Sequence, residues 1–222
     1  MKSTSLTLVA MIFLVGTSSF SQTNDLKEKY EKGLESARKK MGETSYRVIG
    51  VNKYYSNRKI EGICNIVEEY VSDKENSSIM SSEKPFDRCG YSKITVGGDS
   101  YTRILPGGWT KDTKEGEAGM AMRENVLTVQ GERYTPKEVN SYRITPDKVG
   151  NENATLYFHY LVIELKDGLS FLVSYDWINE KGLIIKTYTH SSFAVPENVF
   201  SETTETYEYN PKDLKIKAPV IN

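Results

Sequence analysis

His159 and His190 are the side chains of this chain best suited to proton transfer near neutral pH, and the sequence contains no other histidine. Two histidines that share a site can hold a metal ion or act as an acid and a base. Strand alternation, applied to the hairpins described below, places His159 on one face of a sheet and His190 on the other. The sequence therefore predicts no joint histidine site, and we expect His159 to bond to a neighbouring hydroxyl such as that of Tyr175.

The acidic residues do not predict a catalytic site either. Glu68 and Glu69 are adjacent in a run with strand character, so their side chains point to opposite faces and do not form a paired-carboxylate site. The sequence also lacks a nucleophile elbow, a phosphate-binding loop, a zinc-protease helix and a dinucleotide fingerprint. We therefore expect neither an enzyme nor a bound cofactor or metal ion.

Cys64 and Cys89 are the two cysteines of the chain. A structural zinc site needs four ligands, so two cysteines alone are a poor metal site. In an exported protein a disulfide between them is the preferred prediction, with two free thiols as the alternative. In the chain-entropy model such a bridge would stabilise the fold by roughly 3 kcal/mol.

The N-terminus has the order of a secretory signal peptide: Lys2, an apolar run over 6–14, and the small-residue run "GTSSFSQ". We expect cleavage after Ser21, which leaves 22–222 as a single domain without a transmembrane segment, in the periplasm or outside the cell. The residue directly after the expected cut is Gln22 and not a cysteine, which excludes lipid attachment at the new N-terminus. Removing Lys2 from the 29 basic residues leaves 28 against 30 acidic ones, a balance that does not suit nucleic-acid binding.

The first element of the mature chain is predicted to be a helix over 25–41. Its apolar residues are spaced by three or four positions and so fall on one face. Asp25 and Glu28 resemble a capping box, and Gly42 supplies a stop. The apolar positions are Leu26, Tyr30, Leu34, Ala37 and Met41.

After Gly42 the helical period gives way to short runs of β-branched and aromatic residues separated by turn residues, which predicts sequential antiparallel hairpins. Two polar segments, 73–85 and 106–120, fit neither a strand nor a short turn, and long loops of this kind are often mobile or functional. The predicted strands cover 45–55, 63–71, 92–96, 101–105, 126–130, 141–145, 156–165, 169–178, 183–190 and 202–209.

The hairpin at 156–177 is the candidate binding surface. "KDG" and "EKG" each fit a three-residue turn that ends in a left-handed glycine, which pairs Leu165 with Leu169 and Asn179 with Leu183. This register collects alternate residues of both strands on one strongly apolar face and leaves a mixed face behind it. The residues predicted to line a ligand cavity, each with core packing as the alternative role, are Tyr157, Leu161, Ile163, Phe171, Val173, Tyr175 and Trp177.

The tail "TYEYNPKDLKIKAPVIN" adds a family resemblance. Together with the signal peptide, the helix and the antiparallel strands, it resembles the superfamily of LolA-like and LppX-like envelope proteins. The resemblance implies an α+β fold in which a curved, incompletely closed antiparallel sheet, a half-barrel, packs on the N-terminal helix and carries a lipid or acyl chain in the space between. The residues that carry the resemblance are Tyr207, Tyr209, Leu214, Ile216, Ala218 and Pro219.

These observations lead to one preferred prediction of function and one alternative. The preferred prediction is an exported envelope protein that binds a lipid or another hydrophobic ligand without chemical turnover. The alternative is an envelope scaffold with a filled core, in which Trp109 and the mixed face of the sheet contact a protein partner. A cavity of several hundred Å³ between helix and sheet would favour the first prediction.

Overall fold

The computed structural model describes most of the chain from residue 24 onward. The described residues are 24–82, 89–104, 107–112, 128–129, 132–133, 137–165, 168–192 and 199–221. The expected signal peptide, 1–21, lies outside them.

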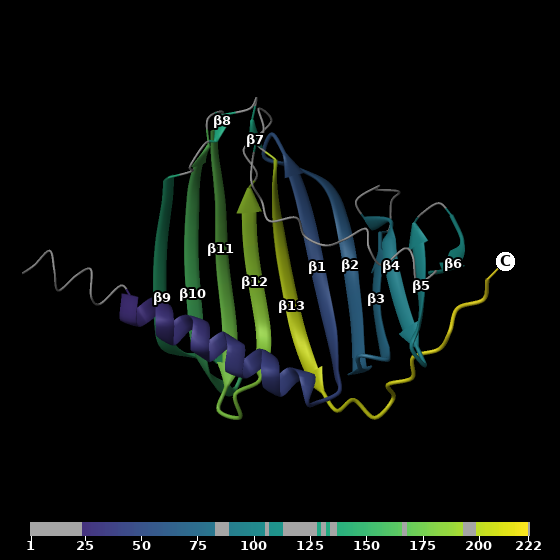
Figure 1. The fold of residues 1–222 in the computed structure, drawn as a ribbon. Coiled ribbons are helices and arrows are strands. Elements are labelled where there is room, and N and C mark those ends of the chain that lie inside the picture. The colour runs from purple at the N-terminus through teal and green to yellow at the C-terminus, as the bar shows by residue number, and fades with distance from the viewer. Residues whose placement is uncertain are drawn as a thin grey trace, which may run out of the picture.

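One helix and thirteen strands make up the described part of the chain (Figure 1). The helix covers residues 24–42. The strands are β1 (Tyr46–Ser56), β2 (Lys59–Ser72), β3 (Glu75–Ser81), β4 (Tyr91–Val96), β5 (Asp99–Ile104), β6 (Trp109–Lys111), β7 (Thr128–Val129), β8 (Glu132–Arg133), β9 (Lys137–Val149), β10 (Glu152–Leu165), β11 (Gly168–Asn179), β12 (Ile184–Ser192) and β13 (Phe200–Tyr209).

The N-terminal helix forms where the apolar spacing predicted it. Tyr30, Leu34 and Ala37 are buried on one side and form a core cluster with Ile178 and Ile184 of the sheet. On the solvent side, ion pairs between residues four positions apart link neighbouring turns. The helix is therefore amphipathic and held mainly by its packing on the sheet.

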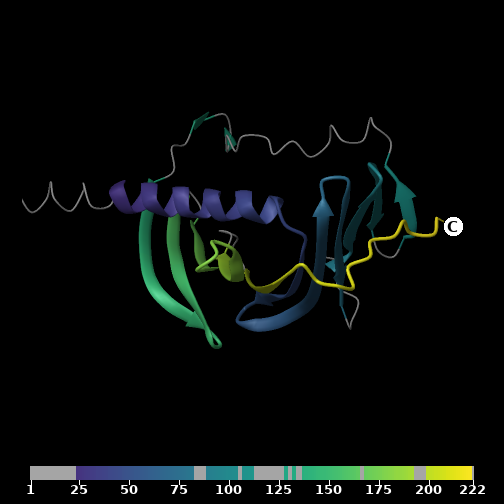
Figure 2. The same ribbon diagram turned by 90° about the horizontal axis from the view of Figure 1, so that it is seen from below.

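Eleven strands form one antiparallel sheet in the order β6-β5-β4-β3-β2-β1-β13-β12-β11-β10-β9, and the short pair β7-β8 stands apart. β1 and β13 pair in the middle, with Tyr46 opposite Tyr209. The sheet is curved, and the helix lies across its hollow side (Figure 2). Because β6 and β9 are not paired with each other, the sheet stays open. The predicted fold class, an open curved sheet on an N-terminal helix, is confirmed.

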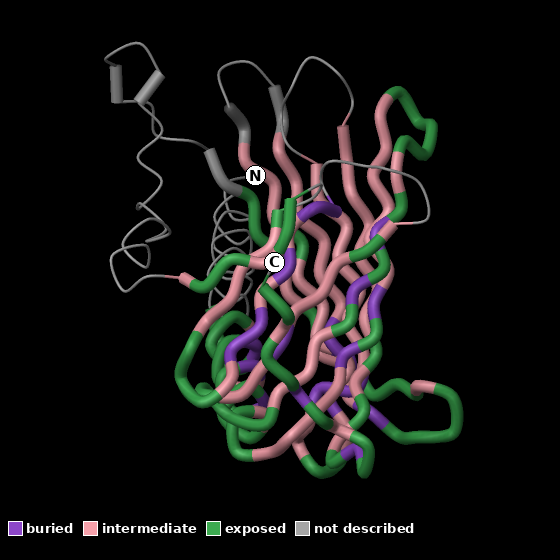
Figure 3. Tube along the Cα trace, turned by 90° about the vertical axis from the view of Figure 1, so that its right-hand side faces the viewer, coloured by how far each residue is buried: buried purple, intermediate pink, exposed green. Residues whose placement is uncertain are grey.

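The sheet has two surfaces, which we call helix-facing and outer. A β-carbon built on Gly33 of the helix would lie 2.7 Å from the hydroxyl oxygen of Tyr157, so Tyr157 marks the helix-facing surface. Side chains alternate along each strand, which assigns every other residue to the outer surface. Buried residues lie mainly in the lower half of the molecule, at the level of the helix (Figure 3).

The first predicted hairpin register is wrong by one residue. β10 and β11 pair Leu165 with Gly168, and hence Leu161 with Leu172, so the connection is two residues long and not three. The second hairpin is as predicted at its turn, where the Asn179 N–H donates to the Leu183 carbonyl and Gly182 has φ of 76°. A bulge between Trp177 and Ile178 then shifts the rest of the β11–β12 pairing.

Both unassigned segments contribute strands to the sheet, β3 inside it and β6 at its edge. β3 occupies much of 73–85 and pairs with both β2 and β4. β6 begins at Trp109 and pairs with β5, where the Arg103 guanidinium lies 4.9 Å from the centre of the Trp109 ring. Residues 113–120 lie outside the described part.

The predicted disulfide is confirmed. Cys64 and Cys89 are bonded, with Cα atoms 5.3 Å apart, and both are fully buried. The bridge ties β2 to the segment that leads into β4.

The C-terminal tail is fixed beside β1 and β2, since Arg47 of β1 forms ion pairs with both Glu69 of β2 and Asp213 of the tail.

Candidate functional site

A cleft of about 990 Å³ lies between the N-terminal helix and the helix-facing surface. The helix supplies one wall, and strands β10 to β13 supply the floor. The volume is at the upper end of the range usual for small-molecule sites. The lining residues are Tyr30, Glu31, Leu34, Glu35, Arg38, Lys39 and Met41 of the helix, with His159, Leu172, Ser174, Asp176, Ile184, Thr187, Thr189, Glu205 and Tyr207 of the sheet.

The floor of the cleft carries two carboxylates held by hydroxyl groups. The Ser174 hydroxyl donates to Asp176 Oδ2 at 2.9 Å. Thr187 and Tyr207 both donate to Glu205 Oε2, each at 3.0 Å. These bonds fix the two acidic side chains on the floor, because one oxygen of each carboxylate accepts from a hydroxyl group of the sheet.

Burial changes the titration of the floor. It raises the pKa of Asp176, which is 8% exposed, while Ser174 and Arg38 act in the opposite direction. Burial also raises the pKa of Tyr30 and of Tyr207 above that of a free phenol. Both phenols therefore stay protonated and act as hydrogen-bond donors at physiological pH.

An apolar hollow of about 280 Å³ continues beyond Leu172. Its lining residues are Leu161, Ile163, Ser170, Phe171, Leu172 and Ser191. Leu172 lines both spaces. The helix-facing surface thus has a polar part near Asp176 and an apolar part near Ile163.

The residues predicted to share one apolar face are divided by the observed register. Each odd-numbered residue of β10 lies opposite an even-numbered residue of β11, and directly opposite residues share a surface. The helix-facing surface therefore carries Tyr157, Leu161 and Ile163, whereas the outer surface carries Phe171, Val173, Tyr175 and Trp177. Their predicted grouping on one face is therefore wrong. Ser174, Asp176, Thr187 and Glu205, which line the cleft, were not predicted, since polar residues gave no apolar signal.

The outer surface carries a continuous group of rings. Tyr175 lies 5.0 Å from Phe158, 6.0 Å from Trp177 and 5.7 Å from Tyr188, centre to centre. A second group joins Phe171, His190, Phe200 and Tyr55. Lys186 lies over the Trp177 ring, and Trp177 donates to Asp147 at 2.8 Å. Phe171, Tyr175 and Trp177 of the predicted set therefore contact other rings on the outer surface.

The two histidines lie on opposite surfaces, as predicted. His159 Nε2 is 3.0 Å from Asn140 Oδ1, and the ring stacks on Tyr142, so Tyr175 is not its partner. Burial lowers the pKa of His159. His190 Nε2 is buried on the outer surface and has no hydrogen-bond partner. In the described part of the chain neither ring is hydrogen-bonded to a carboxylate.

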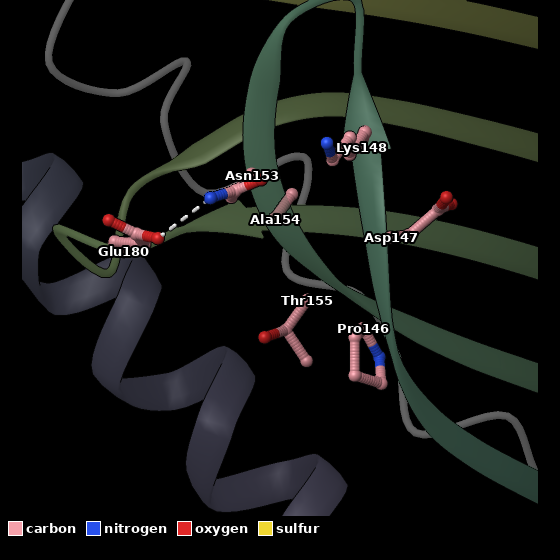
Figure 4. Close-up of a pocket in the computed structure, with 7 residues that line it drawn as sticks. All are labelled: Pro146, Asp147, Lys148, Asn153, Ala154, Thr155 and Glu180. Carbon is pink, nitrogen blue, oxygen red and sulfur yellow. Dashed lines mark hydrogen bonds between the residues drawn. The ribbon is translucent and has the colours of Figure 1, made fainter.

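A third hollow, of about 570 Å³, lies at the lower ends of β9 and β10. Figure 4 shows Asn153 donating to Glu180, at 3.2 Å, while Asp147 points away from both. Asp147 instead accepts from Trp177 on the outer surface. The polar groups of this third hollow therefore do not converge on a common ligand position.

Across the described residues, no three His, Cys, Asp or Glu side chains come close enough together to hold a metal ion. No helix in that part of the chain combines the length and the apolar character needed to cross a membrane.

Neither a protein-family model nor a curated protein matches the sequence. Three solved structures are similar to it, each with a TM-score of 0.33. LolA superfamily protein NE2245 from Nitrosomonas europaea is 11% identical, over 86% of this chain and 94% of its own. A domain described as an outer membrane lipoprotein-sorting protein, from Vibrio parahaemolyticus, is 10% identical, over 84% and 95%. A DUF1329 family protein from Desulfovibrio piger is 10% identical, over 83% and 93%.

Proposed function

We propose that this chain is an exported envelope protein that binds an amphipathic ligand, a lipid or an acyl-bearing molecule, without chemical turnover. The observation that carries the proposal is the cleft of about 990 Å³ between the helix and the sheet, which joins an apolar hollow at Leu172. A cleft of this size between helix and sheet favours ligand binding over an interior filled by side chains.

Export is supported by the N-terminal sequence and by the disulfide. The order of Lys2, apolar run and small residues fits a signal peptide of residues 1–21 that leaves 22–222 as the mature domain. Disulfides persist in oxidising compartments such as the periplasm. Cys64 and Cys89 are fully buried as a bonded pair, which fits a structural bridge.

Binding without turnover is supported by the contacts of the polar groups. His159 is bonded to an amide oxygen and stacked on a phenol ring. Ser174 donates to Asp176 and His159 is bonded to Asn140, so these residues do not form the Ser-His-Asp hydrogen-bond chain of a nucleophilic triad. Tyr157, Leu161 and Ile163 remain the proposed ligand contacts on β10, and Leu172 joins them from β11. For Phe171, only its place in the lining of the apolar hollow supports a ligand contact.

The test uses two neighbouring residues that face opposite ways. Leu172→Trp places a bulky ring in the cleft, and Val173→Trp places the same ring on the outer surface. The full-length gene is expressed in its native source, the protein is purified gently, and organic extracts are analysed by mass spectrometry. We expect a lipid to co-purify with the wild type and with Val173→Trp and to be lost from Leu172→Trp.

Circular dichroism of both variants establishes that they are folded. The absence of any lipid from the wild type would contradict the proposal. Retention of the lipid by a folded Leu172→Trp variant would place the ligand elsewhere.

A protein-interaction role is the second candidate, because Tyr160 and Val139 are exposed beside the ring clusters of the outer surface, 36% and 53% respectively. Exposed apolar patches are typical of interaction sites. In that case in-cell cross-linking from position 160 should trap a partner. Leu172→Trp should leave this cross-link intact.

A further inference from the structure

We propose that the ligand of the cleft is an amphipathic cation: an apolar chain along Leu161, Ile163 and Leu172, with a protonated amine at Asp176 and Glu205. This inference rests on the proposed function and adds the chemical class of the ligand. The geometry that carries it is the placement of two carboxylates on one floor without a matching positive charge.

Asp176, Thr187 and Glu205 face one another across β11, β12 and β13. The register pairs Asp176 with Thr187 and Thr187 with Glu205. Because neighbouring strands are about 4.8 Å apart, the two acidic residues are about 10 Å apart along the floor. One ammonium group between them lies within a few ångströms of both carboxylates.

Neither carboxylate has a salt bridge within the described part of the chain. Their hydrogen-bond donors, Ser174, Thr187 and Tyr207, are neutral hydroxyl groups. Buried carboxylates are ordinarily paired with a cation, and Asp176 is only 8% exposed. A cationic head group supplies the missing partner.

The sheet side of the cleft contains no lysine or arginine among its lining residues. Arg38 and Lys39 are exposed on the helix, where Glu31 and Glu35 also line the cleft. Arg38 acts on Asp176 through space, but the ion pairs of the described residues do not include one between them. A carboxylate or phosphate head group would meet two like charges at the floor, which is strongly unfavourable.

The apolar part of the ligand has a defined direction. Leu172 lines both the cleft and the hollow beyond it, and Ser174 and Asp176 follow on the same surface of β11. A chain laid along Ile163 and Leu172 therefore brings its head group to Asp176. The polar and apolar ends of the site are thus ordered along one strand.

The experiment compares three ligands of equal chain length, dodecylamine, dodecanol and dodecanoate, all below their micelle concentrations. Binding to the mature chain is measured by calorimetry at pH 7. We expect dodecylamine to bind at least tenfold more tightly than dodecanoate. Asp176→Asn and Glu205→Gln should each reduce that preference severalfold, while Glu202→Gln, on the outer surface of β13, should leave it unchanged.

The outcomes separate the two proposals. If dodecanol and dodecanoate bind and dodecylamine is no tighter, the head-group inference is overturned and the binding function stands. An amine preference that survives in both acidic-residue variants also overturns the inference. If none of the three ligands binds the folded protein, the proposed function itself is contradicted.

Discussion

Gly33 of the helix lies directly against the ring of Tyr157 on β10. A β-carbon at Gly33 would come 2.7 Å from both Cζ and the hydroxyl oxygen of that ring. Real contacts of this kind are longer, so the absent side chain at Gly33 lets the helix approach the sheet. The ring is itself held beside Tyr30, 6.1 Å away centre to centre.

Gly33→Ala should lower the free energy of unfolding by about 1–2 kcal/mol. Alanine favours a helix by up to ~1 kcal/mol, but overpacking against Tyr157 costs about 1–3 kcal/mol. Urea unfolding measures the difference. Gly42→Ala is the control, because nothing lies within 4 Å of a β-carbon there. Equal effects of the two substitutions would show that Tyr157 does not restrict the site.

Loss of the disulfide should lower stability by about 3 kcal/mol, as expected for the closure of a loop of 25 residues. Cys64→Ala with Cys89→Ala makes the change, and urea unfolding with and without reductant measures it. The oxidised wild type should lose the same amount on reduction, whereas the double variant should be insensitive to reductant. A double variant that still responds would place the redox effect elsewhere.

Asp176→Asn should raise stability at pH 7.5, and the gain should shrink as the pH falls. Burial raises the pKa of Asp176 in the folded protein, so the folded state takes up a proton before the unfolded state does. The ionised form thus destabilises the fold above the folded pKa, and this penalty disappears as the pH falls through it. Unfolding curves at pH 7.5 and 4.5 measure both quantities.

Asp147→Asn provides a control of opposite sign. The hydrogen bond from Trp177 holds the pKa of Asp147 below its ordinary value, so its carboxylate stabilises the fold above the unfolded pKa and loses that contribution as the pH falls. This variant should not be more stable than the wild type at pH 7.5. A gain like that of Asp176→Asn would contradict the assigned cause.

Arg47→Ala should release the C-terminal tail. Arg47 is bound to Glu69 at 2.8 Å and to Asp213 at 3.1 Å, and its side chain is 18% exposed. Amide exchange around Pro211 and Ile216, which are buried in the wild type, should therefore become faster. Lys111→Ala removes an exposed pair with Asp99 and should leave the tail unchanged. Unchanged exchange in Arg47→Ala would mean that packing alone holds the tail.

The sequence was sufficient for the helix, because the spacing of Tyr30, Leu34 and Ala37 leaves one buried face. β3 was missed because its residues, "ENSSIMS", are mostly polar. It forms because β2 and β4 both pair with it and because Ser78 donates to Glu68 at 2.9 Å. Polar strands inside a sheet give no apolar alternation to detect.

The site could be predicted only in part, because one turn decides its composition. Reading "KDG" as a three-residue turn moves every β11 side chain to the other surface. The observed two-residue connection places Asp176, and not Trp177, opposite Tyr157. No local sequence pattern distinguishes a two-residue from a three-residue connection between β10 and β11. The choice depends on which β11 side chains pack against the helix and on how β11 pairs with β12.

The pairing of β1 with β13 has a consequence for how the chain folds. Strands β1 to β6 and β9 to β12 are two series of neighbouring hairpins, each able to form from local contacts. They become one sheet only when β13, the last strand, aligns with β1, which brings Tyr209 back to Tyr46. Closing so long a loop is slow, so we expect folding to be limited by this step. A chain that ended before Phe200 would leave β1 and β12 as two additional open edges, available for aggregation.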